Sequence, residues 1–202
     1  MYGQPEIPRS ALLKKADADF IKQVTDELGS RENASIAWAM RAEQYMKSGN
    51  MDYAMRRYNQ SWLLNPNNYL SYWGFGGVLL RQGKRDEAIK HLEKAKQLID
   101  DEYQEVALLS DTGSAYSVKA DSIPKKNTQE RARYFDLATQ NFQQSTKQDP
   151  NYPNVWFFWA RSLYFQEKYK ESWEKVKKGQ SLGANIPSRF LEVLHENFPE
   201  PK

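Results

Sequence analysis

The stretch YWGFGGVLLRQGKRDEA at Tyr72–Ala88 decides the fold, because it resembles the sequence that lies 34 residues before it. At this offset the matching pairs are Trp38 and Tyr72, Ala42 and Gly76, Gly49 and Gly83, Ala54 and Ala88, and Ser61 and Ala95. Self-similarity at a fixed period of about 20–50 residues is typical of repeat proteins. The pattern therefore predicts a chain built from copied units.

Further copies follow. The pattern returns at Trp156, where Ala160, Leu163, Ser172 and Gly179 lie 118 residues after Ala42, Tyr45, Ala54 and Ser61. That distance is three periods of 34 residues with 16 residues added. A third unit with extra length must lie between, and most of the extra residues fall in KADSIPKKNTQE at 119–130, which we expect to form a long connection.

Each unit has the pattern of two amphipathic helices joined by a short turn. In the first unit, apolar or small residues recur at three- and four-residue spacing over 36–47 and again over 51–64, with SGN between them. Gly49 and Gly83 follow the first helix of their units, where a left-handed residue commonly ends a helix. Proline turns, NPNN at 65–68 and DPNYPN at 149–154, then close two of the units.

These features resemble the tetratricopeptide repeat (TPR): a 34-residue period, an early aromatic, a small residue one turn later, a turn glycine and a closing proline. The resemblance spans about residues 35–184, and the sequence as a whole looks similar to small bacterial TPR proteins of uncharacterised role. It implies an all-α, right-handed superhelical α-α solenoid of four TPR-like units with a helical cap at each end. Asp100 and Ala184 depart from the pattern at the closing proline, and Glu167 departs from it at the turn glycine.

The expected organisation follows from the repeats and the ends. Before them, Ser10 is a plausible N-cap, Gly29 a helix stop, and the apolar stripe that should cover the first unit comprises Leu12, Leu13, Ala16, Phe20, Val24 and Leu28. After them, Phe190, Leu191, Val193 and Leu194 should cover the last unit. The predicted segments are an extended tail over 1–8, a capping helix over 9–30, a repeat region over 31–186 with units at about 35–68, 69–102, 103–152 (insertion near 119–130) and 153–186, and a C-terminal capping helix and tail over 187–202.

The glycines of the opening stretch have two interpretations. A dinucleotide-binding loop needs G-x-G-x-x-G after a β-strand, but Leu79 stands at the third glycine position after Gly74 and Gly76, and no strand pattern precedes it. Gly76 occupies the small-residue position of the repeat. It is therefore predicted to let two helices approach closely.

No catalytic, cofactor or metal site is predicted. The chain has no cysteine, and His91 and His195 lack metal-ligand spacing. Its 29 basic and 26 acidic side chains give a net charge of +3 without long basic runs, which disfavours nucleic-acid binding. No apolar stretch is long enough for a membrane span.

The resemblance implies binding through a concave groove lined by the first helix of each unit. The principal groove candidates are Glu43, Trp73, Arg81, Phe157, Arg161 and Tyr164; further positions by alignment are Ala39, Met46, Gly77, Leu80, Ser110, Ser114, Ser117 and Phe165. A carboxylate clamp is not supported, because Ala39, Glu43, Trp73 and Gly77 replace its lysine and asparagine set. Two interpretations of the aromatic residues stay open: they line a groove for an apolar peptide with an acidic residue, or they pack as core.

The resulting functional hypothesis is a non-catalytic scaffold or adaptor that binds a peptide or a partner helix of a protein whose identity the sequence does not give. Self-association as a homo-oligomer is the alternative, and small-molecule binding is a further one. The resemblance favours an exported or periplasmic protein whose signal was removed, with a cytoplasmic protein as the other possibility.

Overall fold

A computed structural model describes residues 8–201. The expected extended tail over 1–8 lies, except for Pro8, outside the described residues. Regular structure in the described range is entirely α-helical, and none of its helices is both long and apolar enough to cross a lipid bilayer. The chain divides into two compact units, residues 1–99 and 100–202, and each is considered separately below.

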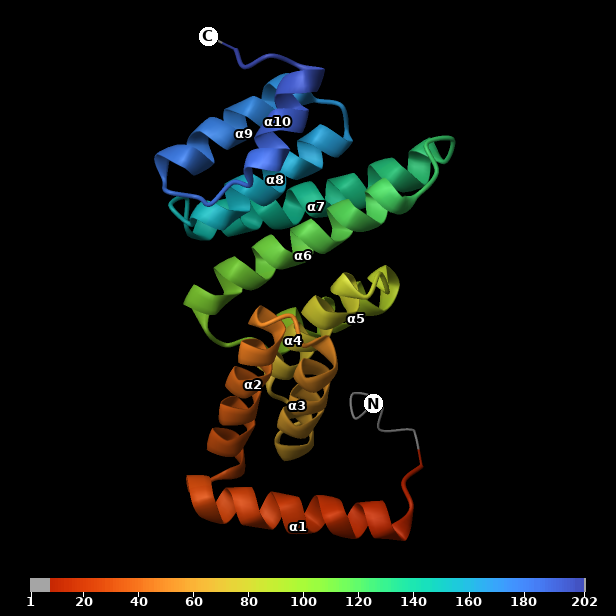
Figure 1. The fold of residues 1–202 in the computed structure, drawn as a ribbon, viewed down its shortest axis with the longest axis vertical. Helices are drawn as coiled ribbons and strands as arrows, with labels where there is room; N and C mark the ends of the chain where they lie inside the picture. The colour runs from red at the N-terminus through yellow and green to blue at the C-terminus, as the bar shows by residue number, and fades with distance from the viewer. Residues whose placement is uncertain (1–7, 202) are drawn as a thin grey trace. The chain divides into compact units, whose positions relative to one another are not determined.

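Unit 1 contains one single helix followed by two helix–turn–helix pairs (Figure 1). The helices are α1 (Ala11–Leu28), α2 (Arg31–Lys47), α3 (Met51–Leu64), α4 (Tyr69–Arg81) and α5 (Arg85–Leu98). Within each pair the turn is as predicted: Gly49 and Gly83 have φ of 81° and 77°. Glycine adopts this left-handed conformation without the steric cost that a Cβ would add.

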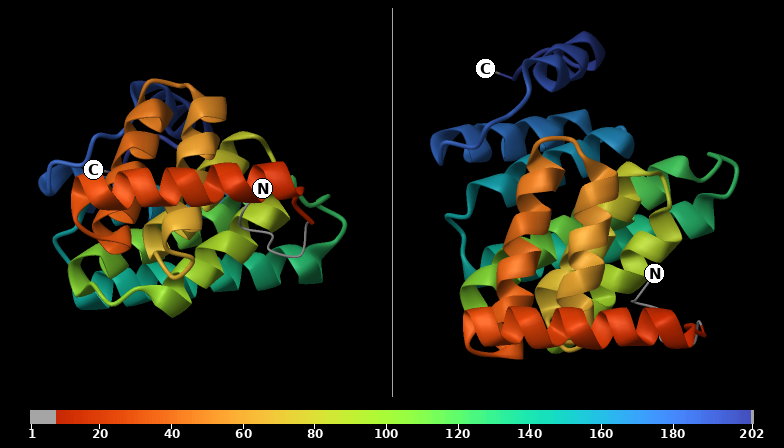
Figure 2. Two further views of the ribbon diagram at one scale, coloured as in Figure 1. Left: turned by 90° about the horizontal axis from the view of Figure 1, so that it is seen from below. Right: turned by 60° about the horizontal axis from the view of Figure 1, so that its bottom comes forward.

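Helix α1 covers the first pair as a cap, but with only half of the predicted stripe. Ser10 accepts a hydrogen bond from the Leu13 amide at the start of the helix, and Figures 1 and 2 show α1 crossing one end of the α2–α3 pair. Phe20 packs edge-on against Trp38 with ring centroids 5.6 Å apart. Leu12 and Leu13, by contrast, are 78% and 48% exposed. The prediction that they cover the first repeat is therefore wrong, because the start of α1 extends beyond the α2–α3 pair.

The core of unit 1 explains the glycine of the opening stretch. Gly76 of α4 lies so close to α5 that a Cβ on it would stand 2.6 Å from Leu92 Cγ and 3.2 Å from the Ala88 carbonyl oxygen. Phe75, beside it, is 1% exposed. The interpretation of Gly76 as a packing glycine is confirmed.

Unit 2 contains two helix pairs and a final helix. They are α6 (Glu102–Ser122), α7 (Thr128–Gln148), α8 (Pro153–Phe165), α9 (Tyr169–Ser181) and α10 (Ser188–Asn197). Helices α6 and α7 have 21 residues each, against 13 in α8 and α9. The extra residues near 119–130 therefore lengthen both helices and leave only 123–127 as a loop, which corrects the expectation of a long connection.

The turn between α8 and α9 keeps the repeat geometry without glycine. Glu167, which stands at the turn-glycine position, has φ of 62°. Its carboxylate forms an ion pair with Lys125 of the α6–α7 loop at 2.5 Å. The turn conformation is thus retained although a residue with a Cβ has replaced glycine.

Helix α10 packs on the last pair with the predicted apolar residues. Phe190 and Leu194 are buried beside Trp173 of α9, and Leu191 and Val193 are partly buried against the same cluster. The indole nitrogen of Trp173 also donates a hydrogen bond to the Phe198 carbonyl at 2.8 Å.

Candidate binding surfaces

The six principal candidates fall in both units. Unit 1 carries Glu43 on α2 and Trp73 and Arg81 on α4, whereas unit 2 carries Phe157, Arg161 and Tyr164, all on α8. Each set is described within its own unit.

In unit 1 the charged candidates are exposed but already paired. Glu43 forms an ion pair with Lys47 one turn later, at 2.7 Å. Arg81 Nη1 donates a hydrogen bond to the Met46 carbonyl near the end of α2, at 2.9 Å. Exposed pairs of this kind contribute little to stability, so a ligand could displace them at small cost. Trp73 is half-buried.

Helix α2 also exposes apolar side chains that the candidate list omitted. Ile36 is 46% exposed and Met40 is 59% exposed. They lie one turn apart on the helix, and Glu43 follows at the next turn. The sequence signal was available, because i, i+4 and i+7 positions share one face of a helix.

In unit 2, Arg161 is held in an apolar and poorly solvated position. Its Nη2 donates a hydrogen bond to Ser114 Oγ of α6 at 2.7 Å, and its guanidinium carbon lies 5.7 Å and 5.5 Å from the ring centroids of Phe157 and Phe158. Its Nε is buried and has no hydrogen-bond partner in the described part of the chain. Burial lowers the pKa of this arginine from its usual value.

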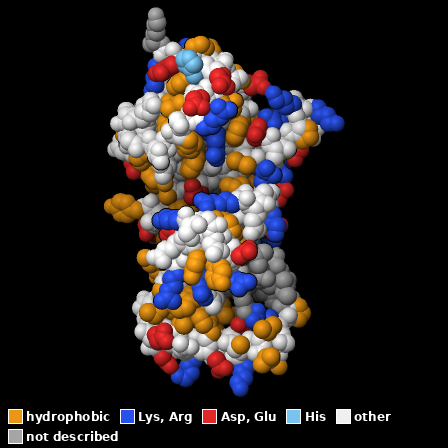
Figure 3. All heavy atoms as spheres, in the orientation of Figure 1, with side chains coloured by type: hydrophobic (Ala, Val, Ile, Leu, Met, Phe, Trp, Pro, Cys, Tyr) orange, Lys and Arg blue, Asp and Glu red, His pale blue; other side chains and the backbone are white. Residues whose placement is uncertain are grey.

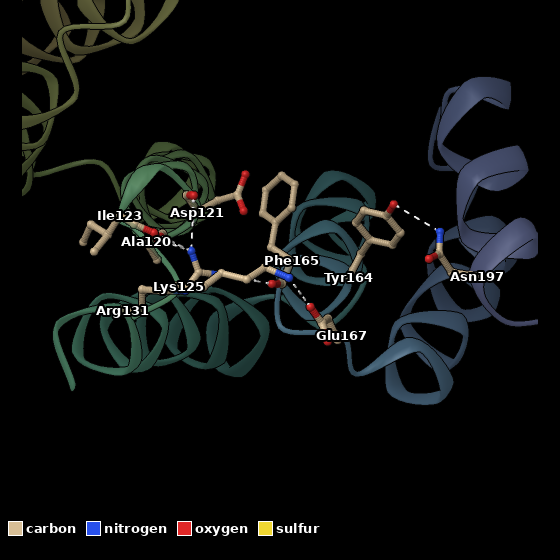
Figure 4. A network of polar contacts seen from close by, with 9 residues as sticks. All are labelled: Ala120, Asp121, Ile123, Lys125, Arg131, Tyr164, Phe165, Glu167 and Asn197. Carbon is tan, nitrogen blue, oxygen red and sulfur yellow. Dashed lines mark hydrogen bonds and ion pairs between the residues drawn. The ribbon is translucent and has the colours of Figure 1, made fainter. Parts of the chain in front are cut away.

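One side of each of the Phe157 and Tyr164 rings packs against helix α10. Both pack edge-on against Phe190 of α10, with centroid distances of 5.6 Å and 5.7 Å, and the Tyr164 hydroxyl accepts a hydrogen bond from Asn197 at 3.4 Å (Figure 4). Both remain half-buried. The two interpretations of these aromatics are therefore not exclusive, since one ring can support α10 and still present an edge to solvent.

The three aligned serines of α6 are less accessible than groove positions should be. Ser110, Ser114 and Ser117 are 0%, 5% and 1% exposed. The hydroxyls of Ser110 and Ser117 are buried and find no hydrogen-bond partner among residues 8–201. Such orphaned buried hydroxyls are uncommon in folded proteins. They show that this face of α6 is small and polar, with Arg161 bound at its middle serine.

A polar network that the sequence did not indicate fixes the α6–α7 loop (Figure 4). Arg131 of α7 donates hydrogen bonds from Nη1 to the carbonyls of Ala120, Asp121 and Ile123, at 2.8–3.2 Å, and from Nη2 to the Phe165 carbonyl at 3.5 Å. The last carbonyls of a helix have no partner within it, so a guanidinium there satisfies several at once.

The histidines are placed as packing and surface residues. His91 is half-buried against Phe75, with ring centroids 5.2 Å apart, and this burial lowers its pKa from 6.5. His195 is exposed on α10. Across residues 8–201, no three His, Asp or Glu side chains are grouped so that they could hold a metal ion.

Comparison with known proteins identifies the fold. No family model and no curated protein matches the chain. Among solved structures, a chain of the APC/C hetero-tetramer Cut9-Hcn1 superposes on 83% of this chain with a TM-score of 0.65 at 17% identity. This chain spans about a third of that one, since the match covers 32% of it.

A second solved structure, YrrB, is described as a TPR protein with an unusual peptide-binding site. It is 17% identical to this chain, with a TM-score of 0.39, and the match covers 88% of this chain and 98% of YrrB. The all-helical architecture and the superposition on the Cut9-Hcn1 chain show an α-α solenoid fold, as the repeats predict.

Proposed function

We propose that the protein is a non-catalytic scaffold that binds an extended peptide or a helix of a partner protein, and that Arg161 anchors an acidic group of that partner. Each unit is proposed to carry a binding surface of its own: Phe157, Arg161 and Tyr164 line the one in unit 2, and Glu43, Trp73 and Arg81 line the one in unit 1. The observation that carries the proposal is that the half-buried Arg161 guanidinium is hydrogen-bonded to a neutral hydroxyl and to no carboxylate of the described residues.

Among residues 8–201, Arg161 has no negatively charged partner for its positive charge. A buried or half-buried charge is normally paired, because removal from water costs several kcal/mol that an opposite charge offsets. Here a neutral hydroxyl, Ser114 Oγ, is the hydrogen-bond acceptor. An arginine has five N–H donors, so most of its hydrogen-bonding capacity is left for a ligand.

A carboxylate suits this position better than another acceptor. The planar guanidinium can bind a carboxylate through two parallel hydrogen bonds, and such a pair is stronger where water is excluded. The rings of Phe157 and Phe158 flank the same guanidinium. An Asp or Glu side chain, or a chain terminus, with apolar neighbours would therefore match both features.

The test begins with a selection of random displayed peptides on the purified protein. The selected peptides are expected to share an acidic residue flanked by apolar ones. Affinity of one such peptide is then measured by fluorescence polarisation for the wild type and for Arg161→Gln. Loss of a charge-assisted hydrogen bond of about 1.5–3 kcal/mol predicts at least about tenfold weaker binding.

Arg133→Gln is the matched control. Arg133 lies exposed on α7, with its guanidinium carbon 6.0 Å from the ring centroid of Tyr134, so its removal changes the net charge equally and should leave the affinity unchanged. Circular dichroism checks that each variant is folded. Selected peptides without acidic residues, or equal binding by Arg161→Gln, would contradict the proposal.

A further inference from the structure

A second surface, in unit 1, has features of a binding pocket that the groove does not include. A pocket of about 570 Å³ opens beside the α2–α3 pair. Its lining comprises Trp38, Arg41, Gln44, Tyr45, Ser48 and Arg57. Five of these residues lie on α2 and its C-cap, and Arg57 comes from α3. Basic and hydrophobic side chains gather side by side over these two helices in Figure 3.

The pocket carries two guanidinium groups and no carboxylate. Arg41 stacks on the indole of Trp38, with its guanidinium carbon 4.1 Å from the ring centroid. Arg57 donates a hydrogen bond from Nη1 to Gln60 Oε1 at 2.6 Å. In the described part of the chain, neither arginine forms an ion pair, and no Asp or Glu lines the pocket.

Neighbouring contacts hold the pocket walls in place. Gln60 Oε1 accepts hydrogen bonds from both Arg57 and the Trp38 indole nitrogen, the latter at 2.9 Å. Tyr45 stacks on Tyr53 of α3, with ring centroids 5.3 Å apart. The cations and the aromatic rings are thus positioned before any ligand arrives, which lowers the entropic cost of binding.

We infer that this pocket binds a phosphate monoester carried by a planar ring. Two unpaired guanidiniums match the charge and the oxygen geometry of a phosphate group. Trp38 is buried under the Arg41 guanidinium and Tyr45 is stacked on Tyr53, so a flat group would stack on the outer face of the exposed Arg41 guanidinium. The volume is many times that of a single small ion, so the phosphate alone would leave most of the pocket empty.

Phenyl phosphate is the probe, and inorganic phosphate and phenol are its two halves. Each is titrated into the full-length ¹⁵N-labelled protein while amide chemical shifts are followed. Phenyl phosphate is expected to shift α2 and α3 signals saturably, with a Kd of about 1 mM or lower. Each half alone is expected to bind several-fold more weakly. Phosphotyrosine amide and a nucleoside monophosphate, titrated next, distinguish a modified protein side chain from a small metabolite as the source.

Variants of neighbouring arginines separate a built site from general charge attraction. Arg41→Gln and Arg57→Gln should each weaken phenyl phosphate binding about tenfold or more. Arg57→Lys, which keeps the charge but removes the planar fork, should weaken it to a smaller extent. Arg56→Gln is the control, because Arg56 lies over Tyr53 at 5.5 Å and does not line the pocket.

Three results would overturn the inference. They are no saturable shift up to about 10 mM phenyl phosphate, equal affinity for inorganic phosphate and phenyl phosphate, and a loss in Arg56→Gln as large as in Arg41→Gln. This pocket and the Arg161 site share no residue, and their proposed ligands carry different groups, a phosphate and a carboxylate. Either proposal can therefore fail without the other.

Discussion

At the scale of single residues, Gly76 and Gly77 of α4 offer a matched pair of substitutions. A Cβ on Gly76 would meet Leu92 Cγ at 2.6 Å and the fixed Ala88 carbonyl, whereas a Cβ on Gly77 would meet only the flexible end of Met46, at 3.3 Å. Alanine gains about 0.5–1 kcal/mol of helix propensity over glycine at both sites. Overpacking costs about 1–3 kcal/mol, and only at Gly76.

We therefore expect Gly76→Ala to lower the free energy of unfolding by about 1–2 kcal/mol and Gly77→Ala to leave it equal or slightly raised. Urea unfolding followed by circular dichroism measures both changes. Equal stability of the two variants would show that α4 and α5 can separate without cost, against the packing role given to Gly76.

Residue roles were predictable from sequence where the repeat supplied a comparison. Gly76 could be assigned because Ala42 and Ala160 occupy the same repeat position. The sequence could place Arg161 on the first helix of its repeat, α8. Its burial and its hydrogen bond to the neutral Ser114 depend on how α6 and α8 pack against each other. Spacing within one helix does not contain that information.

At the scale of elements, Arg131 is expected to hold the end of α6. It satisfies three carbonyls there and reaches a fourth at the end of α8. Arg131→Ala should expose these carbonyls and increase amide hydrogen exchange in the last turn of α6 and in the loop by roughly tenfold, which corresponds to about 1.4 kcal/mol of local stability.

Exchange measured by mass spectrometry on digested protein resolves that segment. Arg133→Ala, two residues along the same helix, supplies the control because its side chain is exposed, lies 6.0 Å from the Tyr134 ring centroid and makes none of these carbonyl hydrogen bonds. Unchanged protection at 117–127 in Arg131→Ala would refute the role.

The insertion shows where element prediction failed. Lysines, asparagine and Pro124 signal a loop over 119–130, and those signals describe 123–127 correctly. The flanking residues nevertheless continue α6 and α7, because two long helices can keep packing against each other beyond the repeat. Tertiary packing of this kind outweighs weak local propensity.

At the scale of the whole molecule, the two compact units predict that the chain can be divided. The boundary falls at Ile99 and Asp100, between α5 and α6, and the buried clusters described above each lie within one unit. Repeat proteins tolerate such cuts because each repeat contacts mainly its neighbours.

Residues 1–99 and 100–202, expressed separately, should each give a helical circular dichroism spectrum and a cooperative thermal transition. The 100–202 fragment should retain the Arg161-dependent peptide binding, and the 1–99 fragment the phenyl phosphate site. A fragment that remains unfolded would mean that its core is completed by the other unit.

The turn at Glu167 has a consequence of another kind. At Gly49 and Gly83 the left-handed conformation is intrinsic to the residue and indifferent to the solution. Glu167 has the same backbone conformation, but its side chain forms an ion pair with the exposed Lys125 of a different loop. Dissolved salt weakens exposed ion pairs. The rigidity of the α8–α9 turn is therefore expected to fall as ionic strength rises, and the Lys125–Glu167 connection between the two loops weakens with it.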